Sequence, residues 1–149
     1  MTLVTRLRHG ACYNLDMRIV VAGDQFWPCH KLASAILRRM LARYGPDIVI
    51  VHGDDTGVAE SFATAAKGLR IRTEEHVADL AHLGAEAIRF SNREMLRGAD
   101  LCVILHRSIL DAATKDLVRQ ALRAVVATYL IADEQGVPRR LKEEDGRLG

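Results

Sequence analysis

The loop at residues 52–57 carries the residues best suited to chemistry, in the order His52, Gly53, Asp54, Asp55, Thr56, Gly57. Its glycines let the backbone approach a ligand closely, and free amide groups at the start of the following helix attract anions. The two carboxylates repel a bare phosphate and better suit ribose hydroxyls, the amino group of a base or Mg2+. A second interpretation stays open, in which the glycines serve a tight turn and Thr56 caps the helix.

Gly23, Asp24 and Trp27 form a second candidate group, in the segment GDQFWP that follows an apolar run. The Trp27 ring is a candidate for stacking on a base, and Asp24 for hydrogen bonding to a ligand. The alternatives are that the ring covers the end of the core and that Asp24 caps local backbone, since aromatic side chains bury large areas wherever they lie.

Two further pairs lie later in the chain. Arg93, beside Asn92, presents a planar set of donors suited to carboxylate or phosphate, unless it only pairs with an acidic neighbour on its helix. Thr114, followed by Lys115, is either a helix cap or a hydroxyl placed on a bound phosphate. His76, Asp79 and His82 have the side chains of a metal site, but they lack a thiolate and a known structural spacing, so we expect no metal there.

These residues are positioned by an alternation of short β-rich runs and amphipathic segments, which is typical of stacked βαβ units. Strands are expected at 18–22, 47–51, 71–77, 101–105 and 126–131, and helices at about 31–44, 58–67, 85–97 and 114–124. The prediction is an α/β Rossmann-like three-layer sandwich. Its parallel sheet has about five strands in the order 3-2-1-4-5, with helices on both faces and ligands bound where the order reverses.

The predicted domain covers residues 17–132. Residues 1–16 are expected to be an N-terminal extension, and Met17, directly before the first strand, is an alternative natural start. Residues 133–149 form a charged tail that we expect to be mobile, the alternative being a short helix docked on a partner.

The composition narrows the class of protein. With 149 residues, 21 basic and 19 acidic side chains and a net charge of +2, the chain fits one domain with no strong field for a nucleic acid. Three cysteines without a CxxC pair predict a reduced compartment, the cytoplasm. No apolar run approaches the length of a membrane span, and the N-terminal residues lack a signal peptide pattern, so no membrane is expected.

Four segments together resemble the YspA, cpYpsA-related branch of the Rossmann-like SLOG (SMF/DprA-LOG) superfamily. They are RIVVAGDQFW, IVIVHGDDTGVAESFATAAK, RFSNREMLRGADLCVILH and TKDLVRQAL. Members of this group are inferred to bind nucleotides or nucleotide-derived ligands and to form oligomers. The resemblance implies ligand contacts for Gly23, Trp27, His52, Gly53, Thr56, Gly57, Asn92, Arg93, Thr114 and Lys115.

The chain departs from the family pattern at three places. Glu60 stands where an aspartate is expected, Ser91-Asn92 replaces an Arg-Asn doublet, and Ala113 replaces a glycine before TKD. The side chain of Ala113 adds a Cβ beside any phosphate held by this loop. The PGGxGT pattern of LOG-type phosphoribohydrolases is absent.

Three functions follow as hypotheses. The leading one is binding or sensing of a nucleotide-like small molecule, with Mg2+ as a candidate cofactor, by a homo-oligomer. The alternative is an N-glycosidic hydrolase in which Glu60 or Asp54 stabilises an oxocarbenium-like centre or activates water. The third is a non-catalytic oligomeric scaffold.

Overall fold

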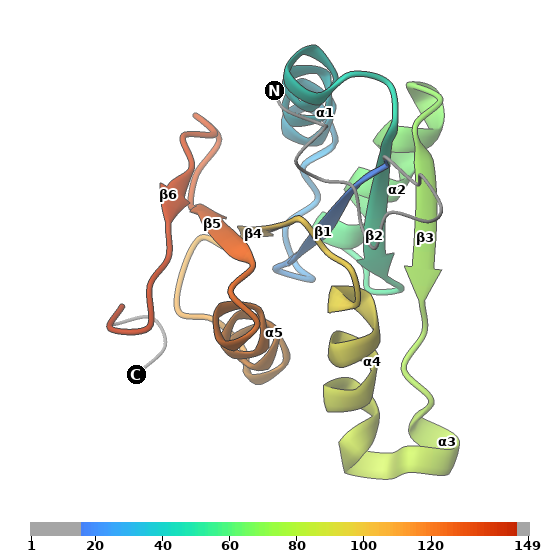
Figure 1. Cartoon of the computed structure of the whole chain (residues 1–149), viewed down its shortest axis with the longest axis vertical. Coiled ribbons are helices and arrows are strands. Elements are labelled where there is room, and N and C mark those ends of the chain that lie inside the picture. The colour runs from blue at the N-terminus through green and yellow to red at the C-terminus, as the bar shows by residue number, and fades with distance from the viewer. Residues whose placement is uncertain (1–15, 146–149) are drawn as a thin grey trace, which may run out of the picture.

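The computed structural model describes residues 16–145, which form a six-stranded sheet covered by helices (Figure 1). The strands are β1 (Met17–Gly23), β2 (Ile48–Gly53), β3 (Arg72–His76), β4 (Leu101–Leu105), β5 (Ala127–Ile131) and β6 (Arg139–Arg140). The helices are α1 (His30–Tyr44), α2 (Val58–Gly68), α3 (Leu80–Leu83), the 3-10 helix η2 (Gly84–Glu86), α4 (Ala87–Leu96) and α5 (Ala112–Arg123).

The strand order is β3-β2-β1-β4-β5-β6, in which the first five strands are parallel and β6 pairs antiparallel with β5. The predicted α/β fold and the order 3-2-1-4-5 are therefore confirmed, and one strand is added at the edge. The order reverses between β1 and β4, where Ile19 pairs with Leu101 and Gly23 with Leu105. This reversal is the point at which open parallel sheets bind their ligands.

Two apolar cores lie on opposite faces of the sheet because successive strand residues point to opposite sides. Ile19 and Val21 of β1 face the core shared with α1 and α2, whereas Val20 faces the core shared with α4 and α5. The result is the predicted three-layer arrangement. Among residues 16–145, no helix is both long and apolar enough to cross a bilayer.

The predicted helix at 85–97 corresponds to α4, and the residues just before it form the 3-10 helix η2 and the short helix α3, which was not predicted. Asp79 caps the short helix α3 by accepting the backbone N–H of His82, and Gly84, with φ of +56°, ends it. The chain then passes through η2 into α4. A positive φ at a glycine is a common helix end, and here it separates α3 from η2 and α4.

The strand β6 lies inside the segment predicted as a charged tail. Leu141 is 1% exposed in the core shared with α5, and its backbone N–H donates to the Thr128 carbonyl. A strand of two residues is too short to show alternation of apolar and polar side chains in the sequence. The strand β6 forms because the edge of β5 offers unpaired backbone groups. Residues 1–15 and 146–149, most of the predicted extension and the end of the tail, lie outside the described residues, and the three-part division of the chain stays a prediction.

Candidate functional site

The loops after β1, β2 and β4 meet at the edge of the sheet where these strands end. The backbone N–H of Asp24 donates to the Leu105 carbonyl over 3.0 Å, and the N–H of Val58 donates to the Asp24 carbonyl over 3.1 Å. The Thr56 hydroxyl donates to the Gln25 carbonyl over 2.9 Å. The tertiary structure therefore joins Gly23, Asp24, Thr56 and Gly57 into one surface, as their positions after parallel strands predict.

Two glycines permit this close approach. A Cβ atom at Gly23 would lie 2.0 Å from the Leu105 carbonyl oxygen, and one at Gly57 would lie 2.4 Å from the Asp24 carbonyl oxygen. Gly57 also has φ of +72°, a conformation that other residues adopt at a cost. Both glycines are thus required by contacts between backbone segments, which is a structural role whether or not a ligand binds.

The β4 loop carries a polar network that the sequence reading did not single out. Asp111 caps α5: its carboxylate accepts the backbone N–H of Thr114 over 3.2 Å and the Thr114 hydroxyl over 2.8 Å. His106 is buried, with its Nε2 atom 3.3 Å from the same carboxylate. The Ser108 N–H donates to Nδ1 of His106, so Nε2 carries the proton that faces Asp111.

The carboxyl groups of this edge differ in their electrostatic surroundings. Partial desolvation, followed by the charges of Asp54 and Asp111, raises the pKa of Asp55 above its ordinary value. Burial would also raise the pKa of Asp111, but hydrogen bonds from Thr114 and the nearby His106 hold it below the ordinary value. An Asp-x-x-Thr pattern before an amphipathic segment is the sequence signal for this cap.

Trp27 does not present a free ring at this edge. It is 3% exposed within the core shared with α1 and α2, and the guanidinium of Arg107 lies 4.8 Å from the ring centroid. This arrangement favours the alternative in which the ring covers the end of the core. Arg107, which is half-exposed, is the cation that the β4 loop brings to the site, and the sequence reading missed it.

Some of the other predicted site residues lie in or next to the β2 loop, and the rest lie on the helices α4 and α5. His52 is buried with Nδ1 2.7 Å from the Gly53 carbonyl oxygen, and Glu60 is exposed in the first turn of α2. Asn92 is buried and donates to the Ala113 carbonyl and the Asp116 carboxylate, so it joins α4 to α5. The exposed Arg93 lies over the Phe90 ring on α4. Lys115 is half-buried near the start of α5.

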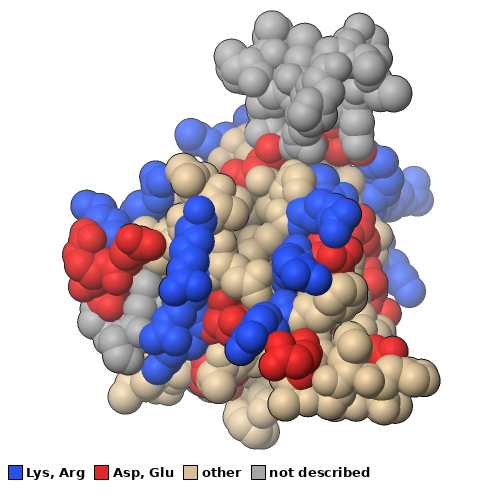
Figure 2. Space-filling view, turned by 60° about the horizontal axis from the view of Figure 1, so that its bottom comes forward, with Lys and Arg blue, Asp and Glu red and all other residues tan. Residues whose placement is uncertain are grey.

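Charge on this side of the molecule is mixed. Figure 2 is turned toward the edge at which the parallel strands end, and it shows Lys and Arg side chains beside Asp and Glu side chains. Neither sign covers the face alone, which does not suit a polyanion. Within residues 16–145, no group of three or more His, Cys, Asp or Glu side chains is placed to hold a metal ion. His76 instead contacts Glu74, and His82 contacts Asp79.

A doubly wound parallel sheet whose loops meet at the strand reversal defines a Rossmann-like protein. Residues 17–82 match the family model described as the YspA, cpYpsA-related SLOG family, which confirms the expected resemblance over these residues. The match contains β1, β2 and the HGDDTG loop, but it ends before the β4 loop.

A solved structure shares the fold. The X-ray structure of DNA processing protein A (DprA) from Streptococcus pneumoniae aligns with a TM-score of 0.63 and 11% identity, covering 80% of this chain and 52% of that one. This chain thus spans about half the length of that structure, and the similarity shows the fold alone. No curated protein matches the chain significantly by sequence.

Proposed function

We propose that the protein binds a nucleotide or nucleotide-derived small molecule at the edge where β1, β2 and β4 end. The observation that carries this proposal is the meeting of three loops at the strand reversal. The Thr56 to Gln25 and Val58 to Asp24 hydrogen bonds join the loops after β1 and β2, and the Asp24 to Leu105 hydrogen bond joins the β1 loop to the end of β4. The helices α2 and α5 both begin at this edge, so the positive ends of their dipoles favour an anionic part of the ligand. The Val58 N–H and the Thr114 N–H are not available to it, because they donate to the Asp24 carbonyl and the Asp111 carboxylate.

The described side chains have distinct roles in this proposal. Lys115 and Arg107 supply positive charge for phosphate, and backbone groups of Gly53 and Gly57 lie beside it. The exposed carboxylates of Asp54 and Asp55 accept hydrogen bonds from ribose or a base, or hold Mg2+ that accompanies the nucleotide. Trp27 has no stacking role here because Arg107 lies over its ring.

The free, buried thiols of Cys29 and Cys102 suit a cytoplasmic setting, which we include in the proposal.

Thermal unfolding against a nucleotide panel tests this function. The panel contains nucleoside mono-, di- and triphosphates, NAD, ADP-ribose and cyclic nucleotides, each with and without Mg2+. A ligand present at a hundred times its Kd stabilises the folded state by about 2.7 kcal/mol, which raises the melting temperature visibly.

The variant Lys115→Ala should reduce that shift. Lys67→Ala, in the last turn of α2 and therefore far along that helix from the loop, is the matched control and should leave it unchanged. Gly57→Val is unsuitable because its side chain would strike the Asp24 and Gln25 backbone. A flat panel would contradict nucleotide binding and favour the oligomeric scaffold, which sedimentation analysis then tests.

Hydrolysis of an N-glycosidic bond is a second candidate, favoured by the raised pKa of Asp55. A carboxyl group that keeps its proton at higher pH can protonate a leaving base, while a neighbouring carboxylate such as Asp54 or Glu60 stabilises the developing positive charge. Release of free base by the wild type, but not by Asp55→Asn or Glu60→Gln, would support this activity. Binding of the panel ligand without release of base would exclude hydrolysis of that ligand.

A further inference from the structure

A groove runs between α1 and the face of β4 and β5 that α1 only partly covers. It exists because the chain continues from β5 into the short strand β6, and no helix follows β5 within residues 16–145. The groove has a volume of about 310 Å³, near the lower limit of roughly 300–1,000 Å³ for small-molecule sites. None of its lining residues belongs to the loops after β1, β2 and β4; they come from α1, β4, β5 and the segment that contains Gly136 and Pro138.

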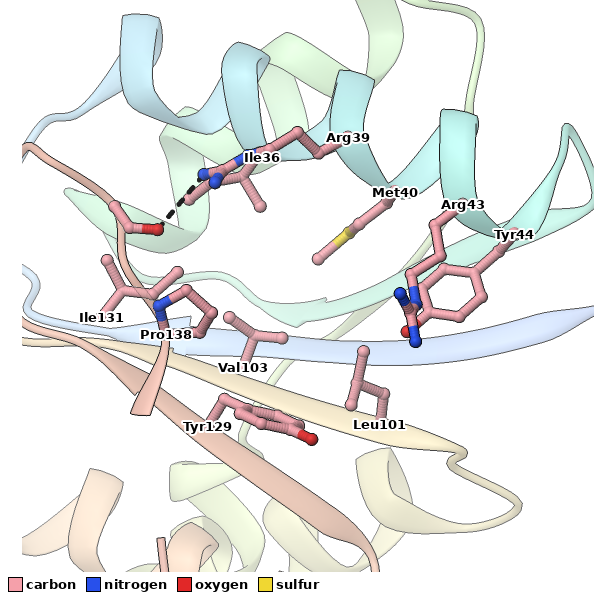
Figure 3. A pocket seen from close by; sticks show the side chains of 11 residues that line it. Ile36, Arg39, Met40, Arg43, Tyr44, Leu101, Val103, Tyr129, Ile131 and Pro138 are labelled. Atoms are coloured by element: carbon pink, nitrogen blue, oxygen red, sulfur yellow. Dashed lines mark hydrogen bonds between the residues drawn. The ribbon is translucent and has the colours of Figure 1, made fainter. Parts of the chain in front are cut away.

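One end of the groove is closed by the segment at Gly136 and Pro138. The Arg39 guanidinium donates to the Gly136 carbonyl over 3.3 Å, as the dashed line in Figure 3 shows. Gly136 has φ of +72°, and a Cβ there would lie 2.9 Å from Leu32 of α1. This close contact holds the segment against the helix.

The walls between the ends are apolar. Ile36 and Met40 extend from α1 toward Val103 of β4 and Ile131 of β5 (Figure 3). Such a surface favours hydrocarbon, because each Å² of apolar area removed from water stabilises a complex.

The other end of the groove is polar and positively charged. Arg43 and Tyr44 extend from α1 above Leu101, and the Tyr129 hydroxyl points toward the same end (Figure 3). The lining residues include Arg39 and Arg43 but no aspartate or glutamate. Among residues 16–145, neither arginine forms an ion pair, and the Arg43 guanidinium lies 5.6 Å from the centroid of the Tyr44 ring. An unpaired guanidinium beside apolar walls selects an anionic head group on an apolar chain.

We propose that this groove binds a small amphipathic carboxylate, with its hydrocarbon chain between α1 and the sheet and its carboxylate on Arg43. A second copy of the chain is a poorer occupant. A twofold dimer places the same patch against itself, so the arginines of both copies would share one interface without an acidic lining residue to neutralise them. A carboxylate neutralises this charge instead.

Calorimetric titration of the full chain with sodium decanoate tests the proposal. Binding should be saturable, with one ligand per chain, and hexanoate and octanoate should bind more weakly, by up to about fifteenfold for every two methylene groups removed. Methyl NMR should show shifts at Ile36, Val103 and Ile131. Decanol, which lacks the charge, should bind at least about tenfold more weakly than decanoate.

Charge reversal identifies the head-group contact. Arg43→Glu should weaken decanoate binding at least about tenfold and should favour decyltrimethylammonium instead. The matched control, Arg38→Glu, changes an exposed arginine of the same helix that does not line the groove and should leave both affinities unchanged. Equal binding of decanol and decanoate, an unaffected Arg43→Glu variant, or no saturable binding would overturn the proposal. So would a dimer that dissociates on this substitution, because a second copy would then occupy the groove.

Discussion

Gly57 contacts the backbone of Asp24 so closely that a Cβ atom on Gly57 would lie 2.4 Å from the Asp24 carbonyl oxygen. This contact brings the start of α2 against the loop after β1. It is also the feature that makes the two loops one surface, since the Thr56 and Val58 hydrogen bonds flank it.

Replacing Gly57 by alanine should therefore destabilise the fold by about 3 kcal/mol, because a strained positive φ is combined with a backbone collision. Gly45 is the control: it has φ of +84° but no atom within 4 Å of an added Cβ, so Gly45→Ala should cost about 1 kcal/mol. Urea denaturation measures both. Equal losses would contradict a role for the contact between the loops.

Stability at low pH should depend on Glu74. The Arg18 guanidinium donates two hydrogen bonds of 2.9 Å to this carboxylate and, aided by His76 against a smaller effect of burial, lowers its pKa from 4.5 to about 2. A lowered carboxyl pKa stabilises the folded state above the unfolded pKa, and this contribution is lost as the pH falls from about 4.5 to about 2. Because 39% of the Glu74 side chain is exposed, we expect the ion pair to contribute only about 1 kcal/mol to the free energy of unfolding.

The variant Glu74→Gln tests this expectation. It should be less stable than the wild type at pH 7, and the difference should shrink on acidification toward pH 2. Glu75→Gln, an exposed neighbour on β3, serves as the control and should behave like the wild type at each pH. A constant difference between the Glu74→Gln variant and the wild type across this range would exclude the ion pair as its origin.

Asn92 should act through helix packing. Its amide donates to the Asp116 carboxylate over 2.9 Å and to the Ala113 carbonyl over 3.1 Å. Asn92→Ala leaves these acceptors short of a donor, at a cost of about 1–2 kcal/mol in denaturation experiments. Asn92→Asp should lower the free energy of unfolding more than Asn92→Ala at pH 7, because it places a second carboxylate beside Asp116. Part of this lost stability should return at acid pH. If Asn92→Ala instead abolished nucleotide binding without loss of stability, Asn92 would be a ligand contact.

Asp111 should stabilise the start of α5. Asp111→Ala removes the acceptor for the Thr114 N–H and should cost about 1 kcal/mol, whereas Asp111→Asn keeps a capping side chain and should cost less. Because the pKa of Asp111 lies below its ordinary value, the wild type should be more stable than the Asp111→Asn variant near neutral pH. This difference in stability should disappear as the pH falls through that lowered pKa. Thermal unfolding at several pH values measures the difference.

The order of the strands and helices along the chain can be predicted from the sequence alone. Continuous apolar runs such as 101–105 must be buried on both faces, so a parallel sheet follows, and amphipathic segments between them must cover it. Right-handed crossovers and helices on both faces favour the order 3-2-1-4-5, and this order places the loop at 52–57 beside Gly23 and Asp24. These predictions depend on the spacing of apolar residues within each segment and on the order of the segments, and both are visible in the sequence.

Which candidate side chains take part in packing depends on the tertiary fold. Asn92 and Trp27 have types suited to a ligand, yet Asn92 is hydrogen-bonded to Ala113 and Asp116 of α5, and the Trp27 ring lies under Arg107. These contacts join residues at least 21 positions apart in the chain. The strand β6 and the groove beside α1 likewise depend on which edge and face of the sheet remain uncovered. Such features come from the packing of segments that are distant in the sequence, and no periodic spacing of residues within one segment predicts that packing.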